Sequence, residues 1–371
     1  MKGLLVWAHS YCRSVLGFYR GLGEAWNVPL KVCIWKENAA LRTNVGFTEN
    51  EFSDMDISFI GNDYCKAKKV LCKHASWHQL FCAYQSVKIY QDLIIEAKGM
   101  GCCIAVASEA PCNMTPGIKG LIKEIYLSFV LPNKIKKQIS CADFIINFSG
   151  DNLLPLMRLG WNKARIIPCG YYSPAIIGSK RVKRTRETWE DFRILLTGIH
   201  QWHRSPFVLL KALNILNKKG LKFECDITQK GPLFTKMKSY VDKHKMGNVH
   251  LLGFLPMEDL ISKYENCSVY IGAGNNEPWG MRLNDALMCG APMIVNKGMG
   301  GYKMVKDYNC GLVFERNNYR ELAREIEMLM RNEHLYLEKA EAAYIAAEKI
   351  TPSVKAAEIV SVIKNRFPNW N

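Results

Sequence analysis

Short apolar segments alternate with amphipathic segments along most of the 371 residues. The short segments are rich in β-branched and aromatic residues and are bounded by Gly, Ser or Pro, which is typical of buried strands. The expected strands are residues 4–8, 31–35, 102–107, 144–148, 164–167, 193–197, 223–228, 249–252, 267–271 and 293–295. Strands that alternate with helices predict an α/β fold of doubly wound parallel sheets, with helices on both faces and ligands at the carboxyl ends of the strands.

Helices are expected between these strands, and a chain of this length favours two domains. The expected helices are residues 14–26, 75–98, 118–141 with an interruption at Pro132, 206–218, 257–265, 319–331, 335–350 and 352–366. The pattern predicts one Rossmann-like domain over residues 1–175 and a second over 193–350. Residues 176–192 are strongly basic and lack apolar periodicity, which predicts an interdomain linker. Residues 351–371 form a last amphipathic helix.

Composition limits the classes of partner and compartment. The formal net charge of +16 indicates an anionic partner, which is a nucleotide phosphate, an anionic membrane surface or nucleic acid. The fourteen cysteines show no C-x-x-C pair and no Cys/His cluster at zinc spacing, so reduced cytoplasmic thiols are expected and a metal site is not. Apolar runs such as 125–131 are far shorter than the ~20 residues of a membrane helix. The N-terminus lacks the apolar region of a signal peptide.

Residues 272–295 carry the clearest signals of a site. A strand is expected before them and another at their end, so Glu277 falls on a loop and Asp285 on the helix that follows. Gly280 lies where that helix is expected to begin, and the unpaired N–H groups and partial positive charge of a helix start bind phosphate. Two carboxylates on either side of an anion site suit a nucleotide sugar, which has hydroxyls on both sides of a diphosphate.

The same stretch resembles glycosyltransferase family four. The resemblance rests on Glu277, Gly280 and Asp285, and after them on Gly290, Pro292 and Val295. It extends upstream to Gly198, Arg204 and the turn Gly231-Pro232-Leu233, and more weakly to residues 142–174. The family usually has Glu where this chain has Asp285. The resemblance implies the GT-B fold, in which two Rossmann-like domains face a central cleft and the last helix crosses back onto the first domain.

The resemblance also implies an activity, that of a retaining, metal-independent glycosyltransferase. It would move a hexose-type sugar from a nucleotide-diphosphate sugar to a glycan or lipid-linked acceptor, with no cofactor besides this donor substrate. Glu277 and Arg204 would be catalytic residues. Glu277 would contact the sugar hydroxyls or support the reacting face of the sugar, and Arg204 would bind the departing diphosphate. Asp285 would hold the ribose. The other implied donor contacts are Gly198, Gly231, Trp279 and Gly280, with His9 and Ser10 from the first domain.

Two positions leave alternatives open. The family has an Arg where this chain has Ile199, and His200 and His203 are candidates for the missing charge, unless they are ordinary exposed loop histidines. Asp285 either holds the ribose or merely pairs with Arg282 one turn back on an exposed helix face.

The first half of the chain offers two signals on the acceptor side. Glu109 follows the expected strand 102–107 and is a candidate catalytic residue, the alternative being an exposed loop carboxylate or a helix cap. Lysines beside apolar residues in the segment 118–137 predict a helix able to lie on an anionic membrane. The alternative is a solvated helix face with an ordinary core stripe. A lipid-linked acceptor would place the enzyme in surface polysaccharide or glycoconjugate biosynthesis, peripheral on the inner face of the membrane.

Two other function classes fit parts of the sequence. A nucleotide-sugar epimerase of the same fold would bind the same donor and release it altered, without an acceptor. A basic nucleic-acid-binding protein would explain the charge, but the sequence has no helix-turn-helix, zinc-finger or RNP-like motif, and its basic residues are spread over linker and helices. Binding to nucleic acid is therefore the less favoured alternative.

Overall fold

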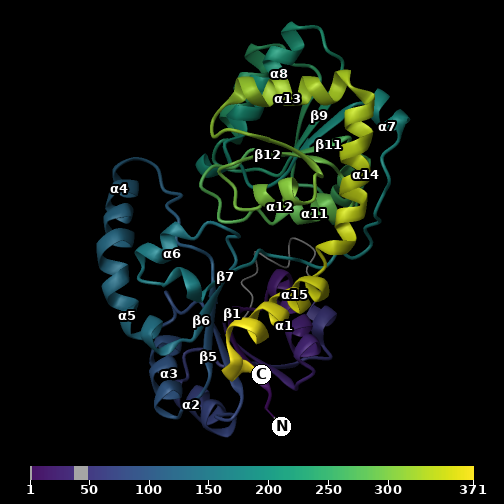
Figure 1. The fold of residues 1–371 in the computed structure, drawn as a ribbon. Coiled ribbons are helices and arrows are strands. Elements are labelled where there is room, and N and C mark those ends of the chain that lie inside the picture. Colours follow the sequence, from purple (N-terminus) through teal and green to yellow (C-terminus); the bar gives the residue numbers. More distant parts are fainter. Residues whose placement is uncertain (1, 37–48) are drawn as a thin grey trace. The chain divides into compact units, whose positions relative to one another are not determined.

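The chain folds into two compact units, each built on one parallel sheet. The computed structural model describes residues 2–36 and 49–371 (Figure 1). The first unit comprises Met1–Pro111, Leu121–Pro174 and Pro352–Asn371, and the second comprises Cys112–Gly120 and Ala175–Thr351. The expected doubly wound α/β architecture with two Rossmann-like sheets is confirmed.

The sheet of the first unit has seven strands in the order β3-β2-β1-β4-β5-β6-β7. They are β1 (Leu4–Ser10), β2 (Leu30–Lys36), β3 (Asp56–Phe59), β4 (His78–Cys82), β5 (Ile104–Ser108), β6 (Phe144–Asn147) and β7 (Ile166–Pro168). One face packs on α1 (Arg13–Trp26) and α15 (Pro352–Arg366). The other packs on α2 (Tyr64–Lys73), α3 (Lys88–Gly99), α5 (Leu131–Cys141) and α6 (Leu154–Arg158). The sheet is therefore covered on both faces, as a parallel sheet requires.

The prediction of one long helix over residues 75–98 is wrong. This stretch contains β4, a turn through Ala83 in the left-handed region (φ 55°), and then α3. All five residues of β4 are buried between β1 and β5, so their sequence shows no alternation of apolar and polar residues. Periodicity cannot distinguish such a buried strand from a buried helix. The correction matters because the strand order reverses between β1 and β4, where ligands of α/β sheets bind.

The expected helix over residues 118–141 is continuous rather than interrupted. It consists of α4 (Gly117–Ile125), a π-helical turn (Tyr126–Val130) and α5. Pro132 lies in the first turn of α5, where the missing N–H and the fixed φ of proline are tolerated. The extra residue in the π turn shifts the register of the helix between α4 and α5.

The sheet of the second unit has six strands in the order β10-β9-β8-β11-β12-β13. They are β8 (Arg193–Leu196), β9 (Glu224–Thr228), β10 (Val249–Gly253), β11 (Val269–Gly272), β12 (Met293–Asn296) and β13 (Gly311–Phe314). The helices are α7 (Arg186–Glu190), α8 (Pro206–Lys218), α9 (Phe234–Lys243), α10 (Met257–Asn266), α11 (Arg282–Met288), α12 (Tyr302–Asp307), α13 (Tyr319–Arg331) and α14 (Glu333–Lys349). The strand order of this sheet reverses between β8 and β11.

The basic stretch 176–192 packs closely on the second unit. Arg184 is buried and donates hydrogen bonds to the backbone carbonyls of Tyr264 (2.6 Å), Cys267 (3.0 Å) and Cys289 (2.7 Å). Nearby, Lys183 pairs with Glu341 of α14 at 2.6 Å. Part of the positive charge in this stretch therefore has a structural role.

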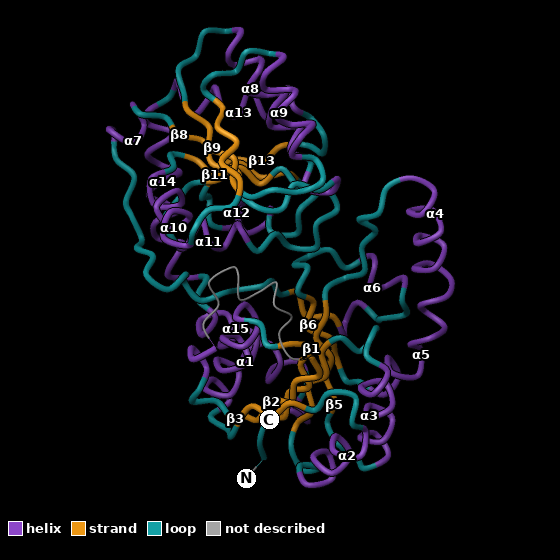
Figure 2. Tube along the Cα trace, turned by 180° about the vertical axis from the view of Figure 1, so that it is seen from behind, coloured by secondary structure: helices purple, strands orange, loops and turns teal. Residues whose placement is uncertain are grey.

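The last helix, α15, lies against α1 in the first unit (Figure 2). The approach is close at Gly21, where a Cβ would lie 2.8 Å from the Cβ of Ala356. In the described part of the chain, no helix combines the length and the apolar character needed to cross a membrane.

Candidate active site

The loops that follow β8 and β11 carry the main site residues of the second unit. These two strands are neighbours in the sheet, and the strand order reverses between them. In α/β sheets, ligands bind outside the carboxyl ends of the strands at such a reversal. Arg204 comes from the loop after β8, and Glu277 from the loop after β11.

Arg204 and Glu277 form an ion pair that joins these two loops. Arg204 Nη1 lies 2.5 Å from Glu277 Oε1, and the two side chains are 32% and 8% exposed. Glu277 Oε2 is also buried, and it has no hydrogen-bond partner among the described residues. Burial raises the pKa of Glu277, while the charges of Arg204 and Arg282 act in the opposite direction. The site thus holds a carboxylate with one satisfied oxygen and one oxygen able to accept a hydrogen bond from a ligand.

Glycines allow the backbone to run directly beneath this carboxylate. A Cβ on Gly274 would lie 2.5 Å from Glu277 Oε2, so any larger residue there would collide with it. Gly280 has φ 100°, a conformation that favours glycine, and a Cβ there would lie 2.3 Å from Met299 Cε. The loop is also bonded to the loop after β12, because Glu277 N donates to Gly298 O (3.1 Å).

Asp285 and Trp279 occupy the helix side of the site. Asp285 lies in the first turn of α11, and its Oδ2 is 3.1 Å from Arg282 Nη1, so the pairing considered as the alternative role is present. The two side chains are only 14% and 26% exposed, which differs from the exposed face that this alternative assumed. Trp279 is buried, and its Nε1 donates to Asn284 Oδ1 at 3.3 Å. Contacts of Asp285 and Trp279 with a donor stay predictions.

The histidines of the β8 loop lie in surroundings that disfavour their charged form. His200 is buried with its Nε2 2.8 Å from the carbonyl of Thr228, and burial lowers its pKa to about 4. Burial and the charge of Arg204 also lower the pKa of His203. The proposal that they supply positive charge at neutral pH is therefore wrong for His200 and disfavoured for His203. Arg204 remains the cation of this loop.

The two upstream glycines shape the same loop. Gly198 has φ 115°, and a Cβ there would lie 3.9 Å from Arg204 Nη1. Gly231 packs on the backbone of His200, with only 2.5 Å between its would-be Cβ and the His200 carbonyl oxygen. Both glycines thus hold the loop in place, and direct contact of either with a donor stays a prediction.

Asn275, which the sequence did not single out, joins four loops at the carboxyl edge of the sheet. Its backbone N–H donates to His203 O (2.6 Å), and its amide Nδ2 donates to Ser205 Oγ (2.8 Å) in the loop after β8. The same amide bonds to Asn317 beyond β13, and Asn296 at the end of β12 donates to Asn275 Oδ1 (2.9 Å).

The candidates in the first unit lie at the carboxyl ends of their strands. His9 and Ser10 end β1, and the His9 ring lies 5.1 Å from the ring of Trp35. Glu109 directly follows β5 and hydrogen-bonds to Tyr171, whose pKa is raised by burial and by this carboxylate. These residues belong to a different unit from Arg204 and Glu277, and a shared site stays a prediction.

Comparison with known proteins identifies the second unit. Residues 181–349 match the family model of glycosyl transferases group 1. The match covers most of the second unit and relates this unit to the group 1 glycosyl transferases. An uncharacterized glycosyltransferase of Methanocaldococcus jannaschii is 29% identical over 131 residues, which are 35% of this chain and 37% of that relative. The chain aligns with less than half the length of the curated relatives that it matches.

Solved structures match the whole chain. Anabaena HepE in complex with UDP has a TM-score of 0.70 at 12% identity and covers 98% of this chain and 100% of its own. A putative UDP-N-acetylglucosamine 2-epimerase from Listeria monocytogenes has a TM-score of 0.61 at 13% identity and covers 100% and 98%. At such identities the likeness establishes the fold, which is GT-B as expected, and leaves the chemistry to the site. Within the described residues, no group of three or more His, Cys, Asp or Glu side chains is arranged as metal ligands.

Proposed function

We propose that the chain is a retaining, metal-independent glycosyltransferase that moves a hexose-type sugar from a nucleotide-diphosphate sugar to a glycan or lipid-linked acceptor. The observation that carries the proposal is the buried, unpartnered Oε2 of Glu277 beside the Arg204 guanidinium. A nucleotide sugar brings both groups that such a site needs, since its sugar hydroxyls donate hydrogen bonds and its diphosphate accepts them.

In the proposed reaction, negative charge develops on the departing diphosphate while the sugar becomes oxocarbenium-like. The bond between the anomeric carbon and the phosphate oxygen breaks, and the bond to the acceptor oxygen forms on the same face. The acceptor proton passes to the departing diphosphate. Arg204 stabilises the diphosphate, and Glu277 holds a sugar hydroxyl through Oε2. Because Arg204 already contacts Glu277 Oε1, phosphate binding and sugar binding are coupled through one side chain.

A uridine nucleotide is the first donor to test. The match to HepE in complex with UDP and the match to a putative UDP-N-acetylglucosamine 2-epimerase both motivate this choice. For the acceptor, we propose a glycan or lipid-linked sugar of polysaccharide or glycoconjugate biosynthesis. All fourteen cysteines are free, which fits a reducing compartment such as the cytoplasm.

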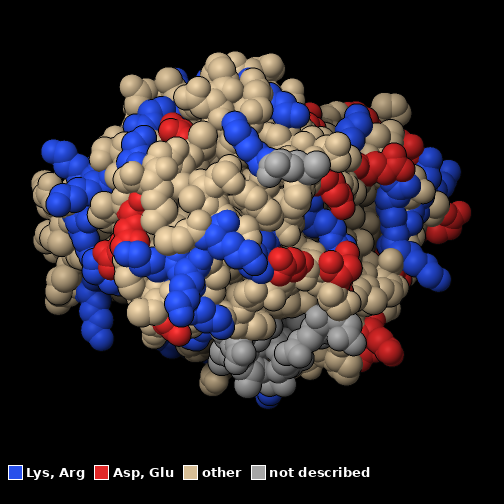
Figure 3. Space-filling view, turned by 90° about the horizontal axis from the view of Figure 1, so that it is seen from below, with Lys and Arg blue, Asp and Glu red and all other residues tan. Residues whose placement is uncertain are grey.

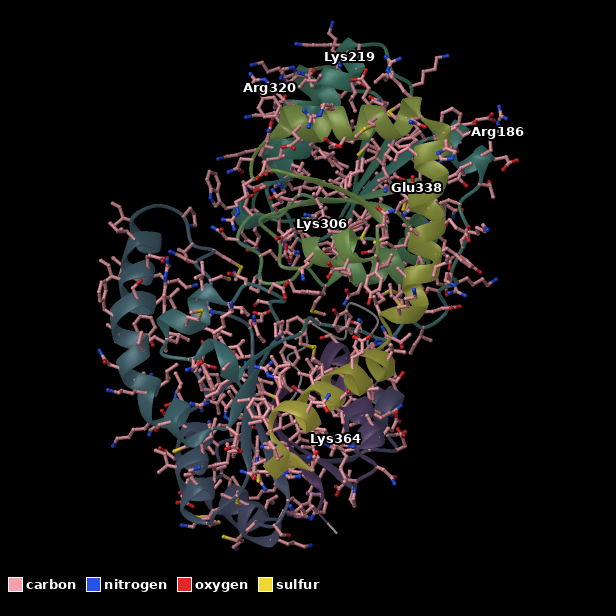
Figure 4. The ribbon with its side chains drawn as sticks, in the orientation of Figure 1. Arg186, Lys219, Lys306, Arg320, Glu338 and Lys364 are labelled. Atoms are coloured by element: carbon pink, nitrogen blue, oxygen red, sulfur yellow. The ribbon has the colours of Figure 1, made fainter. Side chains whose placement is uncertain are left out.

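The charges on one face of the molecule favour the nucleotide sugar over nucleic acid as the anionic partner. On the face shown in Figure 3, Lys and Arg lie in separate groups interspersed with Asp and Glu, rather than in one continuous band. Several basic side chains also have acidic partners: Lys219 at the end of α8 pairs with Glu327 at 2.5 Å, and Arg186 of α7 pairs with Glu190 at 3.0 Å (Figure 4). Long-range binding to a phosphate backbone requires a contiguous positive track.

The decisive experiment separates transfer from epimerisation. Purified protein is incubated with UDP-sugars, with and without an acceptor mixture of lipid and glycan extracts, and the products are resolved by mass spectrometry and NMR. The proposal predicts UDP release that requires an acceptor and a glycoside with the donor's anomeric configuration. An altered nucleotide sugar formed without an acceptor would establish the epimerase instead. Arg204→Ala is expected to abolish transfer, whereas the exposed control Arg320→Ala keeps it.

A further inference from the structure

A second arginine, Arg282, belongs to the candidate active site on its helix side. Arg282 is the first residue of α11, and Asp285 lies three residues later on the same face of this helix. Arg282 Nη1 donates a hydrogen bond to Asp285 Oδ2 at 3.1 Å. Within the described part of the chain, the other N–H groups of this guanidinium have no hydrogen-bond partner. The side chain is 26% exposed, so these N–H groups are accessible to a ligand.

Buried hydroxyl groups lie near the Arg282 guanidinium. Thr197 Oγ1, directly after β8, lies 2.7 Å from Tyr264 Oη and 3.1 Å from Tyr270 Oη. Burial raises the pKa of Tyr270 to about 12, and the positive charges of Arg282 and Arg204 act in the opposite direction. Both guanidiniums therefore lie close enough to act on the same hydroxyl. Because Tyr270 stays neutral at pH 7, it cancels neither of their charges.

The charges placed in the site balance only when Arg282 is counted. Glu277 and Asp285 supply two carboxylates, whereas Arg204 supplies one guanidinium. Burial raises the pKa of Glu277, and Arg282 is one of the two cations that oppose this rise. With Arg204 alone, these side chains would present a net negative charge to a diphosphate, and like charges oppose binding. Arg282 removes this excess of negative charge.

We propose that Arg282 is a second cation of the donor site and binds a phosphate group of the nucleotide donor together with Arg204. This role rests on the proposed function, since it concerns the same donor site. Arg204 acts from the loop after β8 and Arg282 from the start of α11, so the two arginines approach the diphosphate from different elements. The bond to Asp285 fixes the orientation of the planar guanidinium and leaves its other N–H groups for phosphate oxygens.

The test follows the binding of nucleoside diphosphates and of the matching nucleosides by NMR titration. The probes are UDP, GDP and ADP, each compared with its nucleoside. Arg282→Gln should weaken the affinity for the diphosphate that binds the wild type by about tenfold or more, because a charge-assisted bond to phosphate is lost. The affinity for the nucleoside should not change. Arg282→Lys keeps the positive charge without the planar guanidinium and should recover part of the loss.

Matched variants separate binding of phosphate from a role in holding Asp285. The double variant Arg282→Gln and Asp285→Asn leaves no unpaired carboxylate behind. Its affinity for the diphosphate relative to the nucleoside should stay below that of the wild type. The control Arg186→Gln breaks an exposed pair with Glu190 at 3.0 Å and should bind every probe like the wild type. Circular dichroism confirms that each variant keeps its fold.

Three results would overturn the role of Arg282. The double variant would regain the wild-type ratio of diphosphate to nucleoside affinity, or Arg282→Gln would weaken both probes equally, if Arg282 served Asp285 alone. An unchanged diphosphate affinity in Arg282→Gln would remove the role and leave the proposed function standing. A wild type that binds none of the three diphosphates would overturn both.

Discussion

Replacing Glu277 by Gln is expected to stabilise the ligand-free protein and to abolish its response to the sugar donor. Glu277 buries a carboxylate with one oxygen 2.5 Å from Arg204 Nη1 and the other without a partner among the described residues. Burial raises its pKa, against the charges of Arg204 and Arg282. The folded protein thus holds a negative charge that its surroundings disfavour, and Gln keeps the shape while removing the charge.

The magnitude follows from two opposing effects. Burying the charged carboxylate costs about 1–3 kcal/mol, which Gln recovers in part because its neutral amide still leaves one polar atom without a partner. The ion pair offsets part of this cost, but Arg204 is 32% exposed, so solvent screens the pair and its loss costs about 1 kcal/mol or less. We expect a net gain of about 1 kcal/mol in the free energy of unfolding. For a unit of this size, such a gain raises Tm by about 2–4 °C.

The gain in stability from Glu277→Gln depends on pH, and the raised pKa of Glu277 gives the direction of this dependence. Because the folded state holds the Glu277 proton more tightly than the unfolded chain does, the unfolded state binds fewer protons at intermediate pH. The wild type therefore loses stability as pH rises from the ordinary glutamate pKa, about 4.3, through the raised folded pKa. Gln does not titrate. The advantage of Glu277→Gln should be smallest near pH 4 and largest at neutral pH.

The assay is differential scanning fluorimetry between pH 4 and 8, with and without UDP-sugars. The wild type should show a donor-dependent rise in Tm that Glu277→Gln lacks. The control Glu190→Gln, which breaks the exposed pair with Arg186, should change neither Tm nor the donor response (Figure 4). A Glu277→Gln variant that melts several degrees lower at pH 7, or that keeps the full donor response, would refute the reasoning.

Three further substitutions test other parts of the account. Arg204→Lys keeps the positive charge but loses the planar guanidinium that can bind phosphate through two N–H groups. Calorimetry should therefore find an affinity for nucleoside diphosphates that is about tenfold weaker, and an unchanged affinity would contradict the role of Arg204 in binding phosphate. Asn275→Ala should weaken nucleotide affinity as well as lower Tm, whereas Asn217→Ala, which breaks the hydrogen bond to Asn248 (3.0 Å), should lower Tm alone. Arg184→Met should cost about 3 kcal/mol in the free energy of unfolding, because it leaves buried carbonyls unpaired; a loss below about 1 kcal/mol would contradict this role.

The site loops of the second unit were predictable because local rules determine them. Buried strands such as β8 and β11 are short apolar runs with a glycine at their end or two residues beyond it. These glycines mark where the backbone must bend or approach another segment closely. Gly280 has a left-handed conformation, and Gly274 lies under the carboxylate of Glu277. These requirements are visible in a few neighbouring residues, so the loop that presents Glu277 could be located without a structure.

Tertiary features were not predictable in the same way. β4 is buried on both faces and shows no strand period, so its sequence was taken for part of a helix. The burial of His200 and the exposure of Ile118 depend on which distant segments pack nearby. The hydrogen bonds of Asn275 reach partners up to 72 residues away in sequence, at His203, and no local pattern specifies them. The burial of His200 and the exposure of Ile118 were therefore established only by the structure.

The measurement that tests the central claim most directly is calorimetric titration of UDP, GDP, ADP and CMP into the wild type, Arg204→Ala and Arg320→Ala. The account holds that the switch point between β8 and β11 binds the donor diphosphate through Arg204. It predicts that at least one nucleoside diphosphate binds the wild type and Arg320→Ala equally, and binds Arg204→Ala at least tenfold more weakly. Equal affinity in all three proteins would contradict the claim and move the donor site elsewhere.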